Sequence, residues 1–475
     1  MLKGMWMLIY TLAKVVTLTV LTVVVTIAIW IRSRKKRKDA TTFGFLHPYA
    51  SSGGGGERVL WCAVKSISEA MRKANMSCEI VIYTGDSESK KDTLRAVKNA
   101  FNLDIPENSS EFSLRFVRIH TRAWIEASRY PMFTLLGQSF GSMILTLDAL
   151  SRYRPHVFVD TTGYAFSYPI ARWISGCKVV SYTHYPTIST DMFDVVKSRK
   201  AQFNNNALVA SSSVRTQAKL FYYRVFAALY SWAGRRADIV MVNSSWTRGH
   251  VNELFRIPKR THLVYPPCDT TALQRLSIDK PRVNPRIVLS VAQFRPEKNH
   301  ALQLRAFKRM LKQDQKNEFE DVELHMVGSC RNKGDRDRQK ELEQLRDELG
   351  LDRSRVIFHV NAPYPDLVKL LERATIGLHT MRDEHFGIVV VEMMASGAVP
   401  IAHDSAGPEM DIIGCFNPAP GFLASNEKEY ADMLSHALQI DLQPIRRLGR
   451  ERAKRFSQES FQERWWNAIS DVVVR

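Results

Sequence analysis

Residues 374–397, ATIGLHTMRDEHFGIVVVEMMASG, decide the fold of this chain. The apolar run Ala374–Thr380 is typical of a buried strand, and the apolar run Ile388–Ser396 predicts a buried helix that is closed by Gly397. The polar loop EHFG, residues 384–387, separates the two runs. A strand, a loop and a helix in this order form the repeating unit of a parallel α/β sheet.

The same alternation continues on both sides of this stretch. In the first half of the chain we expect strands at Thr42–Leu46, Cys78–Tyr83, His156–Asp160, Lys178–Thr183 and Ala237–Asn243. In the second half we expect strands at Arg286–Phe294, Val322–Gly328, Arg355–Val360, Ala374–Thr380 and Val399–His403, with a charged helix at Arg336–Leu349. Because the proline-containing stretch 280–285 is typical of a linker, the sequence predicts two Rossmann-like α/β domains that face a cleft. We place these domains at residues 42–280 and 281–444, with a helical tail at 445–475.

The first 41 residues have a different character. Val15–Ile31 is an uncharged apolar run, and the apolar residues MWMLIYTLA, which Lys14 separates from it, extend the stretch beyond the roughly 20 residues that cross a bilayer. A basic cluster, RSRKKRK at 32–38, follows in place of a small-residue cleavage site. We therefore expect an uncleaved transmembrane helix at 1–31 and a basic cytoplasmic linker at 32–41, with the rest of the chain in the cytosol.

The overall composition narrows the class of partner. The 475 residues carry a formal net charge of +19, which suits anionic lipids, phosphorylated substrates or nucleic acid about equally. No RRM, KH or zinc-finger signature is present, so we expect no nucleic acid partner. The six cysteines are scattered without a Cys-x-x-Cys pair, which favours reduced thiols over a disulfide framework or a zinc site.

Two loops are suited to anion binding. In SSGGGGERVL at 51–60, the residues Gly53, Gly54, Gly55 and Gly56 follow the first strand and open a helix, so their backbone N–H groups can approach a phosphate or a sugar. The stretch lacks the P-loop pattern, and its alternative interpretation is a flexible surface loop.

The second loop, QFRPEKN at 293–299, follows the first strand of the second half. Its Arg295 and Lys298 could offset the charge of a diphosphate without a metal ion. An ordinary basic loop would show the same pattern.

The loop at 384–387, with the helix after it, has the pattern that most specifically indicates a ligand-binding site. Phe386, Gly387 and Ile388 stand at the beginning of a helix, where backbone amides and the helix dipole favour an anion. Glu392 follows Glu384 within this apolar helix, where a carboxylate needs a partner; a pair of ribose hydroxyls would be suitable. The alternative is a glutamate on the helix surface.

A metal site is not expected. Asp335-Arg336-Asp337 has the Asp-x-Asp form of a metal-binding motif, but it lies in a charged segment at the beginning of a helix and not after an apolar strand. We interpret it as solvated helix surface.

Longer strings carry a resemblance to a known family. FLHPY at 45–49, GGGGERVLWC at 53–62, YTHYPTISTDM at 182–192 and GLHT at 377–380 accompany the two glutamates and the basic loop. Together they resemble the GT-B retaining glycosyltransferases of family 4. Among these they resemble the endoplasmic-reticulum α-1,2-mannosyltransferases that extend a dolichyl-diphosphate oligosaccharide from GDP-mannose for protein N-glycosylation. The likeness runs from about Thr42 to the C-terminus.

The resemblance implies a role for each matching residue. Glu392 would hold the donor ribose, Glu384 would lie beside the transferred mannose, and Lys298 would contact the diphosphate. The Gly53–Gly56 loop would line the same cleft from the first, acceptor domain, and His184 would point at the sugar. Many relatives have an arginine where this chain has Gln293, and Arg295 is the candidate replacement.

The resemblance also implies the reaction and its setting. The enzyme would retain the α-configuration of mannose, and without an evident nucleophile we favour front-face substitution, with no cofactor, no metal and GDP-mannose as co-substrate. The implied partners are the dolichyl-diphosphate oligosaccharide, the membrane and other mannosyltransferases of the same pathway. The implied location is the endoplasmic reticulum membrane, single-pass, with the catalytic domains in the cytosol.

Two other functions remain open from sequence. One is another membrane-associated GT-B transferase with a UDP-sugar donor or a phospholipid acceptor. The other is a non-enzymatic basic membrane adaptor, which would leave the loop motifs unexplained.

Lys219–Arg236 mixes aromatic, apolar and basic residues as an interfacial helix does. We slightly prefer to interpret it as a core helix.

Overall fold

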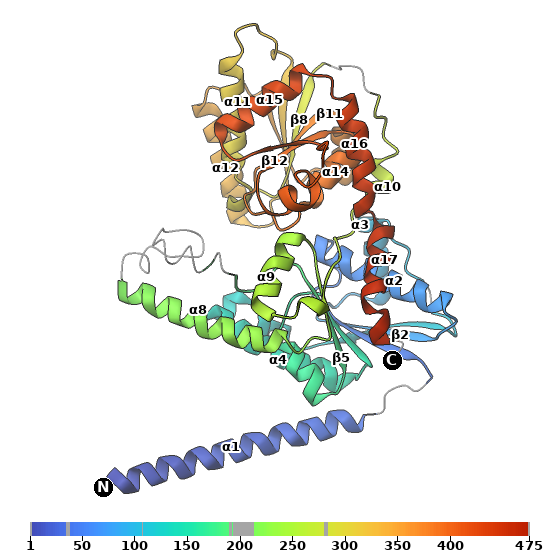
Figure 1. Cartoon of the computed structure of the whole chain (residues 1–475), viewed down its shortest axis with the longest axis vertical. Helices are drawn as coiled ribbons and strands as arrows, with labels where there is room; N and C mark the ends of the chain where they lie inside the picture. The colour runs from blue at the N-terminus through green and yellow to red at the C-terminus, as the bar shows by residue number, and fades with distance from the viewer. Residues whose placement is uncertain are drawn as a thin grey trace. The chain divides into compact units, whose positions relative to one another are not determined.

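The computed structural model describes residues 2–34, 39–106, 108–189, 192, 213–279 and 284–473, and these form two compact units (Figure 1). Unit 1 comprises Met1–Val242, Thr247–Leu263 and Gln462–Arg475, and unit 2 comprises Asn243–Trp246 and Val264–Phe461. Residues 35–38 of the basic cluster, residues 190–191 of the YTHYPTISTDM string and residues 280–283 of the expected linker lie outside the described residues.

Unit 1 is built on a parallel sheet with the strand order β3-β2-β1-β4-β5-β6-β7. The strands are β1 (Thr41–Leu46), β2 (Cys78–Thr84), β3 (Phe112–Arg118), β4 (Val157–Asp160), β5 (Lys178–Thr183), β6 (Ile239–Val242) and β7 (Thr261–Leu263). Strand β2 is buried along its whole length, as expected for an apolar strand with both faces covered. The strand order reverses between β1 and β4, so loops after these strands surround the position where such sheets bind ligands.

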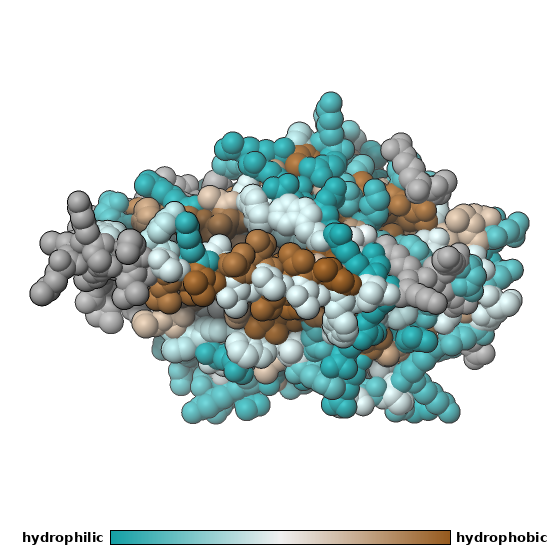
Figure 2. Space-filling model, turned by 90° about the horizontal axis from the view of Figure 1, so that it is seen from below, coloured by the Kyte–Doolittle hydropathy of each residue, from teal (hydrophilic) through white to brown (hydrophobic). Residues whose placement is uncertain are grey.

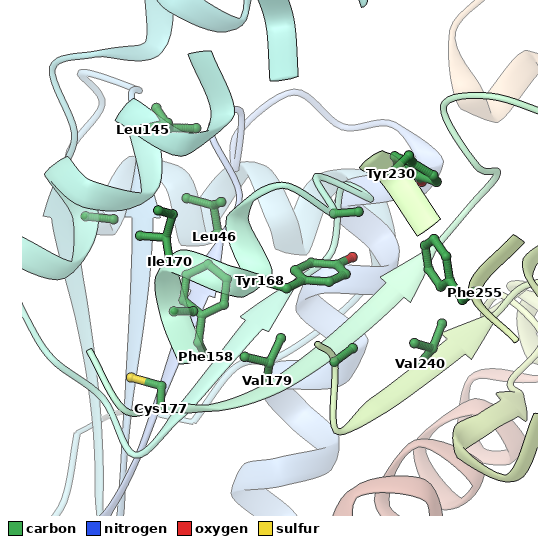
Figure 3. Packing of buried hydrophobic residues seen from close by; sticks show 14 of the residues in the cluster. Leu46, Leu145, Phe158, Tyr168, Ile170, Cys177, Val179, Tyr230, Val240 and Phe255 are labelled. Carbon is green, nitrogen blue, oxygen red and sulfur yellow. The ribbon is translucent and has the colours of Figure 1, made fainter. Parts of the chain in front are cut away.

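Unit 1 also contains helices. They are α1 (Leu2–Ser33), α2 (Gly55–Lys73), α3 (Lys90–Phe101), α4 (Thr134–Arg152), α5 (Ser167–Pro169), α8 (Ser213–Gly234), α9 (Ser245–Phe255) and α17 (Gln458–Val473), with the shorter η1 (Arg122–Ile125), η2 (Ala127–Arg129), η4 (Pro258–Arg260) and the π-helix η3 (Ile170–Ile174). Phe158 and Val179 from the sheet pack with Leu145 of α4 and Tyr230 of α8 in one core (Figure 3).

Helix α1 contains the candidate membrane span that is found among the described residues. Tyr10–Ser33 is long and apolar enough to cross a membrane, with a mean hydropathy of 2.4 and no residue of its most apolar stretch buried. Figure 2, which looks from the side on which α1 lies, shows apolar side chains gathered in a band. Of the α1 side chains that the structure describes, those at the end of the helix are packed: Ile31 is fully buried, and the Arg32 guanidinium donates to the carbonyl oxygens of Trp173 at 2.6 Å and Ile174 at 3.2 Å.

The last helix of the chain returns to unit 1. The Trp465 ring of α17 stacks on Phe45 of β1 at 6.5 Å and on Tyr182 of β5 at 5.9 Å. Ser66 of α2 donates a hydrogen bond to the carbonyl oxygen of Gln462. Unit 1 is therefore closed by residues from both ends of the sequence.

Unit 2 contains a second parallel sheet with the order β10-β9-β8-β11-β12-β13. Its strands are β8 (Arg286–Val291), β9 (Val322–Gly328), β10 (Val356–Val360), β11 (Ala374–Leu378), β12 (Val399–His403) and β13 (Phe422–Ala424). Its helices are α10 (Thr270–Leu273), α11 (His300–Gln313), α12 (Lys333–Glu348), α13 (Tyr364–Arg373), α14 (Ile388–Ser396), α15 (Glu427–Gln439) and α16 (Gln443–Ala453), with the short η5 (Pro296–Lys298), η6 (Pro408–Ile412) and η7 (Lys454–Phe456). The order reverses between β8 and β11, the strands that precede the QFRPEKN and EHFG loops.

All ten predicted strands are present, and some of their ends differ. Strand β8 ends at Val291 rather than Phe294, and β11 ends at Leu378 rather than Thr380. The sequence did not predict β3, β7 or β13, and the tail expected as one helical stretch is interrupted between α16 and α17. All six cysteines are free thiols, as expected.

Candidate active site

The candidate site of unit 2 is centred on the Glu384 carboxylate. Lys298 Nζ donates to Glu384 Oε2 at 2.6 Å, and His379 Nε2 lies 3.2 Å from the same oxygen. Lys298 ends η5 after β8, whereas His379 follows β11 directly. Because β8 and β11 flank the point where the strand order reverses, the Lys298 ammonium, the His379 imidazole and the Glu384 carboxylate lie at the ligand-binding edge of the sheet.

Glu384 is held in the charged form. Its side chain is 16% exposed, and this burial opposes ionisation; the His379 hydrogen bond and the Lys298 charge outweigh it and hold the pKa of Glu384 well below its usual range. A partly buried carboxylate with two such partners is fixed in position before any substrate binds. It can accept hydrogen bonds from the hydroxyls of a sugar.

The backbone of the EHFG loop is fixed as well. The Asp383 N–H donates to Ser405 Oγ at 2.9 Å, and the Gly407 N–H donates to the Glu384 carbonyl oxygen at 3.0 Å. A Cβ on Gly407 would lie 2.3 Å from the carbonyl oxygen of Phe386, so only glycine permits this approach. Residues after β12 therefore support the loop that carries Glu384.

Gly387 and Ile388 lead into helix α14 as predicted. Gly387 has a φ of 105°, which only glycine adopts readily, and Ile388 is the first helical residue. Phe386 is buried, and its ring contacts Tyr265 at 5.6 Å and Phe456 at 5.4 Å. The helix thus begins at the loop and directs its positive dipole end there, which favours an anion.

Glu392 lies in the second turn of α14. It is half-buried, between the buried Val391 and Met393. Its assigned contact with a ribose stays a prediction.

The basic loop differs in detail from what the sequence suggested. Arg295 is half-buried and lies 3.8 Å from the carboxylate of Glu297. Arg331, which follows β9 and was not predicted, donates from Nη2 to Gln293 Oε1 at 3.3 Å. The guanidinium of Arg331 therefore lies beside Gln293, the position at which many relatives have an arginine. No local pattern marks Arg331, because it comes from a different strand.

The interpretation of Asp335-Arg336-Asp337 as solvated surface is wrong for one residue. Asp337 is exposed, but Asp335 is buried and accepts a hydrogen bond from the Arg331 N–H at 3.0 Å. Its own N–H is capped by the Asn332 side chain at the beginning of α12. Asp335 therefore fixes the loop that presents Arg331. Among the described residues, no group of three or more His, Cys, Asp or Glu side chains could hold a metal ion.

A polar layer lies beneath Lys298. Thr380 Oγ1 donates to the Lys298 carbonyl oxygen at 2.9 Å and accepts from Gln303 Nε2 at 3.0 Å. His300 is 1% exposed, and within the described residues neither of its ring nitrogens has a hydrogen-bond partner. Burial and the charges of Arg338 and Lys298 lower the pKa of His300 to about 3, so this ring is neutral.

In unit 1 the glycine loop opens helix α2 as predicted. Gly53 has a φ of +76°, and Gly54 is the N-cap residue. The Gly54 N–H donates to Glu57 Oε2 at 2.7 Å, and Glu57 Oε1 lies 3.5 Å from His47 Nε2. Although burial opposes it, the hydrogen bond with His47 contributes to lowering the pKa of Glu57. Gly55 and Gly56 form the first turn of α2.

His184 follows β5 and lies beside this loop. A Cβ on Gly56 would be 3.7 Å from His184 Nε2, so the structure brings these two predicted residues together. The His184 ring also packs edge-on against Tyr182 at 5.1 Å. The assignment of His184 and Gly53–Gly56 to substrate contact stays a prediction.

Two family descriptions match the two halves of the chain. Residues 40–255 match the N-terminus of the ALG11 mannosyltransferases, and residues 276–460 match the glycosyl transferases group 1. Among curated relatives, a mouse GDP-Man:Man(3)GlcNAc(2)-PP-Dol alpha-1,2-mannosyltransferase is 42% identical over 438 residues, which cover 91% of this chain and 87% of the mouse protein. A human protein of the same name is 40% identical over 448 residues and 93% of this chain, covering 89% of the human protein.

Solved structures share the fold at low sequence identity. Sucrose-phosphate synthase from Thermosynechococcus elongatus has a TM-score of 0.63 at 16% identity and covers 91% of this chain and 99% of its own. Anabaena Alr3699/HepE in complex with UDP has a TM-score of 0.61 at 17% identity and covers 91% of this chain and 100% of its own. The two parallel-sheet α/β units match the GT-B architecture that the sequence predicted.

Proposed function

We propose, from the premise that this chain belongs to the family of GDP-Man:Man(3)GlcNAc(2)-PP-Dol alpha-1,2-mannosyltransferases, that it transfers mannose from GDP-mannose to a dolichyl-diphosphate-linked oligosaccharide. The chain is a glycosyltransferase by its family membership. The donor and the acceptor are carried over from the names of its relatives.

Besides the family membership, one feature of the structure supports a nucleotide-sugar donor. Lys298 and His379 meet on the carboxylate of Glu384, at the strand edge where helix α14 also begins. A nucleotide sugar presents a diphosphate for the ammonium group and the helix N-terminus, and hydroxyls for the carboxylate. The cluster therefore offers complementary partners for both parts of such a donor.

In the proposed mechanism, the protein positions the reactants and stabilises charge. Lys298 Nζ offsets the negative charge that grows on the departing diphosphate, with Arg331 and Arg295 as further cations of the same edge. Glu384 orients the mannose through its hydroxyls, and Glu392 accepts hydrogen bonds from the ribose. We favour front-face substitution without a protein nucleophile and without a metal: the acceptor hydroxyl attacks the anomeric carbon of mannose as the bond to the diphosphate breaks, and the departing phosphate takes the proton of that hydroxyl.

Helix α1 supports a proposal for where the protein is located in the cell. We propose that Tyr10–Ser33 crosses the endoplasmic reticulum membrane once and that both units lie on its cytosolic side. The basic residues 32–38 and the lipid-linked acceptor support this arrangement. Other mannosyltransferases of the pathway are proposed as partners.

A donor competition assay tests the proposal. The full chain in proteoliposomes receives dolichyl-diphosphate oligosaccharide with either GDP-mannose or UDP-sugars, and product is compared for wild type, Glu392→Ala and Glu348→Ala. Glu348 is an exposed glutamate of α12 and serves as the matched control. We expect transfer from GDP-mannose alone, lost in Glu392→Ala and kept in Glu348→Ala. Transfer from a UDP-sugar, or full activity of Glu392→Ala, would contradict the proposal.

A further inference from the structure

A cavity of about 450 Å³, here called the rear cavity, lies in unit 2 at the end of the sheet opposite the candidate active site. Arg286, the first residue of β8, and Thr375, the second residue of β11, both line it. The loops that carry Lys298 and Glu384 follow the other ends of these two strands. The five residues of β11 rise by roughly 17 Å, so the length of the sheet separates the rear cavity from the candidate active site. The residues that line it all belong to unit 2.

Arg286 is already paired within the protein. Its Nε donates to Asp321 Oδ1 at 3.0 Å and to Oδ2 at 2.9 Å, and its Nη1 donates to the Leu438 carbonyl oxygen at 3.2 Å. The charge of Arg286 is therefore offset by Asp321, and its guanidinium joins β8 to the last residues of α15. Arg286 is a structural part of the cavity wall.

Arg446 of α16 also lines the rear cavity, but its hydrogen bonding is incomplete. The side chain is 8% exposed, and its Nε is buried without a hydrogen-bond partner among the described residues. Burial lowers the pKa of the Arg446 guanidinium, and the negative charge of Asp441 opposes that shift. A buried donor without an acceptor costs free energy, which an acceptor brought by a ligand would recover.

Gln443 lies three residues earlier, on the same face of α16. Its Nε2 donates to the Ile278 carbonyl oxygen at 3.2 Å, whereas its Oε1 is buried without a partner in the described part of the chain. The wall of the rear cavity therefore contains one donor and one acceptor whose hydrogen bonds no described residue supplies. A ligand with an acceptor and a donor of its own would complete both.

The rest of the lining limits the charge and the polarity of such a ligand. Three arginines and three carboxylates line the cavity, so their formal charges balance: Arg286, Arg373, Arg446, Asp279, Glu372 and Asp441. A phosphate dianion would meet as many carboxylates as cations, whereas a single carboxylate suits the Arg446 guanidinium in a lining of balanced charge. The buried Ala437, Leu438 and Leu442 add an apolar wall.

We propose that the rear cavity binds a small amphipathic carboxylate, of the size of an apolar amino acid. The carboxylate accepts hydrogen bonds from the Arg446 guanidinium, and the apolar part lies against Leu438 and Leu442. If the ligand is an amino acid, its ammonium group also donates to Gln443 Oε1. The cavity volume lies within the roughly 300–1,000 Å³ of small-molecule sites. This inference does not rest on the proposed function, and a ligand there leaves the Glu384 end of the sheet open.

Protection of an introduced thiol in the full chain tests the proposal. Cys415→Ser removes the exposed cysteine, and the other five cysteines are buried. Thr375→Cys in this background places a thiol in the wall of the rear cavity, where Thr375 is half-buried. Glu348→Cys, at an exposed position of α12, is the control. The proteins are reconstituted in phosphatidylcholine vesicles, and mass spectrometry follows the alkylation of each position by N-ethylmaleimide.

Three probes of one carbon skeleton separate the parts of the ligand. L-leucine carries a carboxylate and an ammonium group, isocaproate lacks the ammonium group, and isoamylamine lacks the carboxylate. We expect L-leucine, or L-leucine and isocaproate, to slow alkylation at position 375 with saturation, and isoamylamine to leave it unchanged. Alkylation at position 348 should be the same with every probe. Protection by L-leucine alone would identify an amino acid as the ligand, and protection by both would identify carboxylic acids in general.

An Arg446→Met variant tests the assigned contact. It should raise the probe concentration for half-maximal protection at least about tenfold, because a hydrogen bond to a charged group is worth that factor in affinity. No protection by either carboxylate would overturn the proposal. Equal protection by isoamylamine would also overturn it, because apolar contact alone would then account for binding. The comparison of the three probes leaves Arg446 in place, so it decides the proposal even if Arg446→Met does not fold.

Discussion

Replacing Lys298 with methionine keeps the length of the side chain and removes its charge. In the wild type, Lys298 Nζ lies 2.6 Å from Glu384 Oε2, and the two side chains are 22% and 16% exposed. A hydrogen bond to a charged group contributes about 1.5–3 kcal/mol, and the remaining exposure places this pair near the lower end. We therefore expect Lys298→Met to lower the free energy of unfolding by about 1.5–2 kcal/mol.

The effect on catalysis should be larger than the effect on stability. If Lys298 also offsets charge on the departing diphosphate, its loss removes one transition-state contact, which is worth about 10²–10³ in kcat. The assay measures transfer from radiolabelled GDP-mannose to the lipid-linked oligosaccharide, with urea unfolding on the same samples. Lys312→Met, an exposed lysine of α11, is the control. A Lys298→Met enzyme with kcat within about threefold of wild type would refute the reasoning, because the charge would then serve folding alone.

Three further predictions concern stability and metal dependence. His300 has a pKa of about 3 in the folded chain, so as the pH falls its imidazole is protonated in the unfolded chain before it is protonated in the folded chain. The free energy of unfolding of the wild type should therefore fall by about 2 kcal/mol from this group between pH 7 and pH 5. Urea unfolding of His300→Leu should not show this decrease. Gly407→Ala should cost about 1–3 kcal/mol and most of the activity, because its Cβ meets the Phe386 backbone, whereas Gly249→Ala, with open space around its Cβ, should be tolerated. Transfer should persist in excess chelator, and complete loss that manganese restores would overturn the metal-free mechanism.

The sequence predicted the central strands because they are short, mostly apolar runs that are buried along nearly their whole length, such as β2 and β9. It did not predict β7 and β13, which are three residues long and lie at sheet edges, or β3, whose pattern is interrupted by the exposed Arg115. Such strands are defined by their neighbour in the sheet and carry little pattern of their own.

The residues of the candidate site that lie in loops directly after a strand could be predicted from the sequence. Lys298, Glu384 and Gly387 were found from loops that follow strands, and the structure brings the first two into contact. His379 and Arg331 were not singled out, because their importance arises from partners on other strands. Local sequence pattern gives the loops of a parallel sheet, whereas contacts across its switch point depend on the strand order.

The return of α17 to unit 1 has a consequence for synthesis. Trp465 covers Phe45 and Tyr182, so the first unit lacks part of its interior until the ribosome has translated the whole of the second. At 5–20 residues per second, that delay is roughly 10–40 s. A premature stop codon in the last helix would therefore damage the half of the protein that was made first, and nascent chains would need protection by chaperones during the wait.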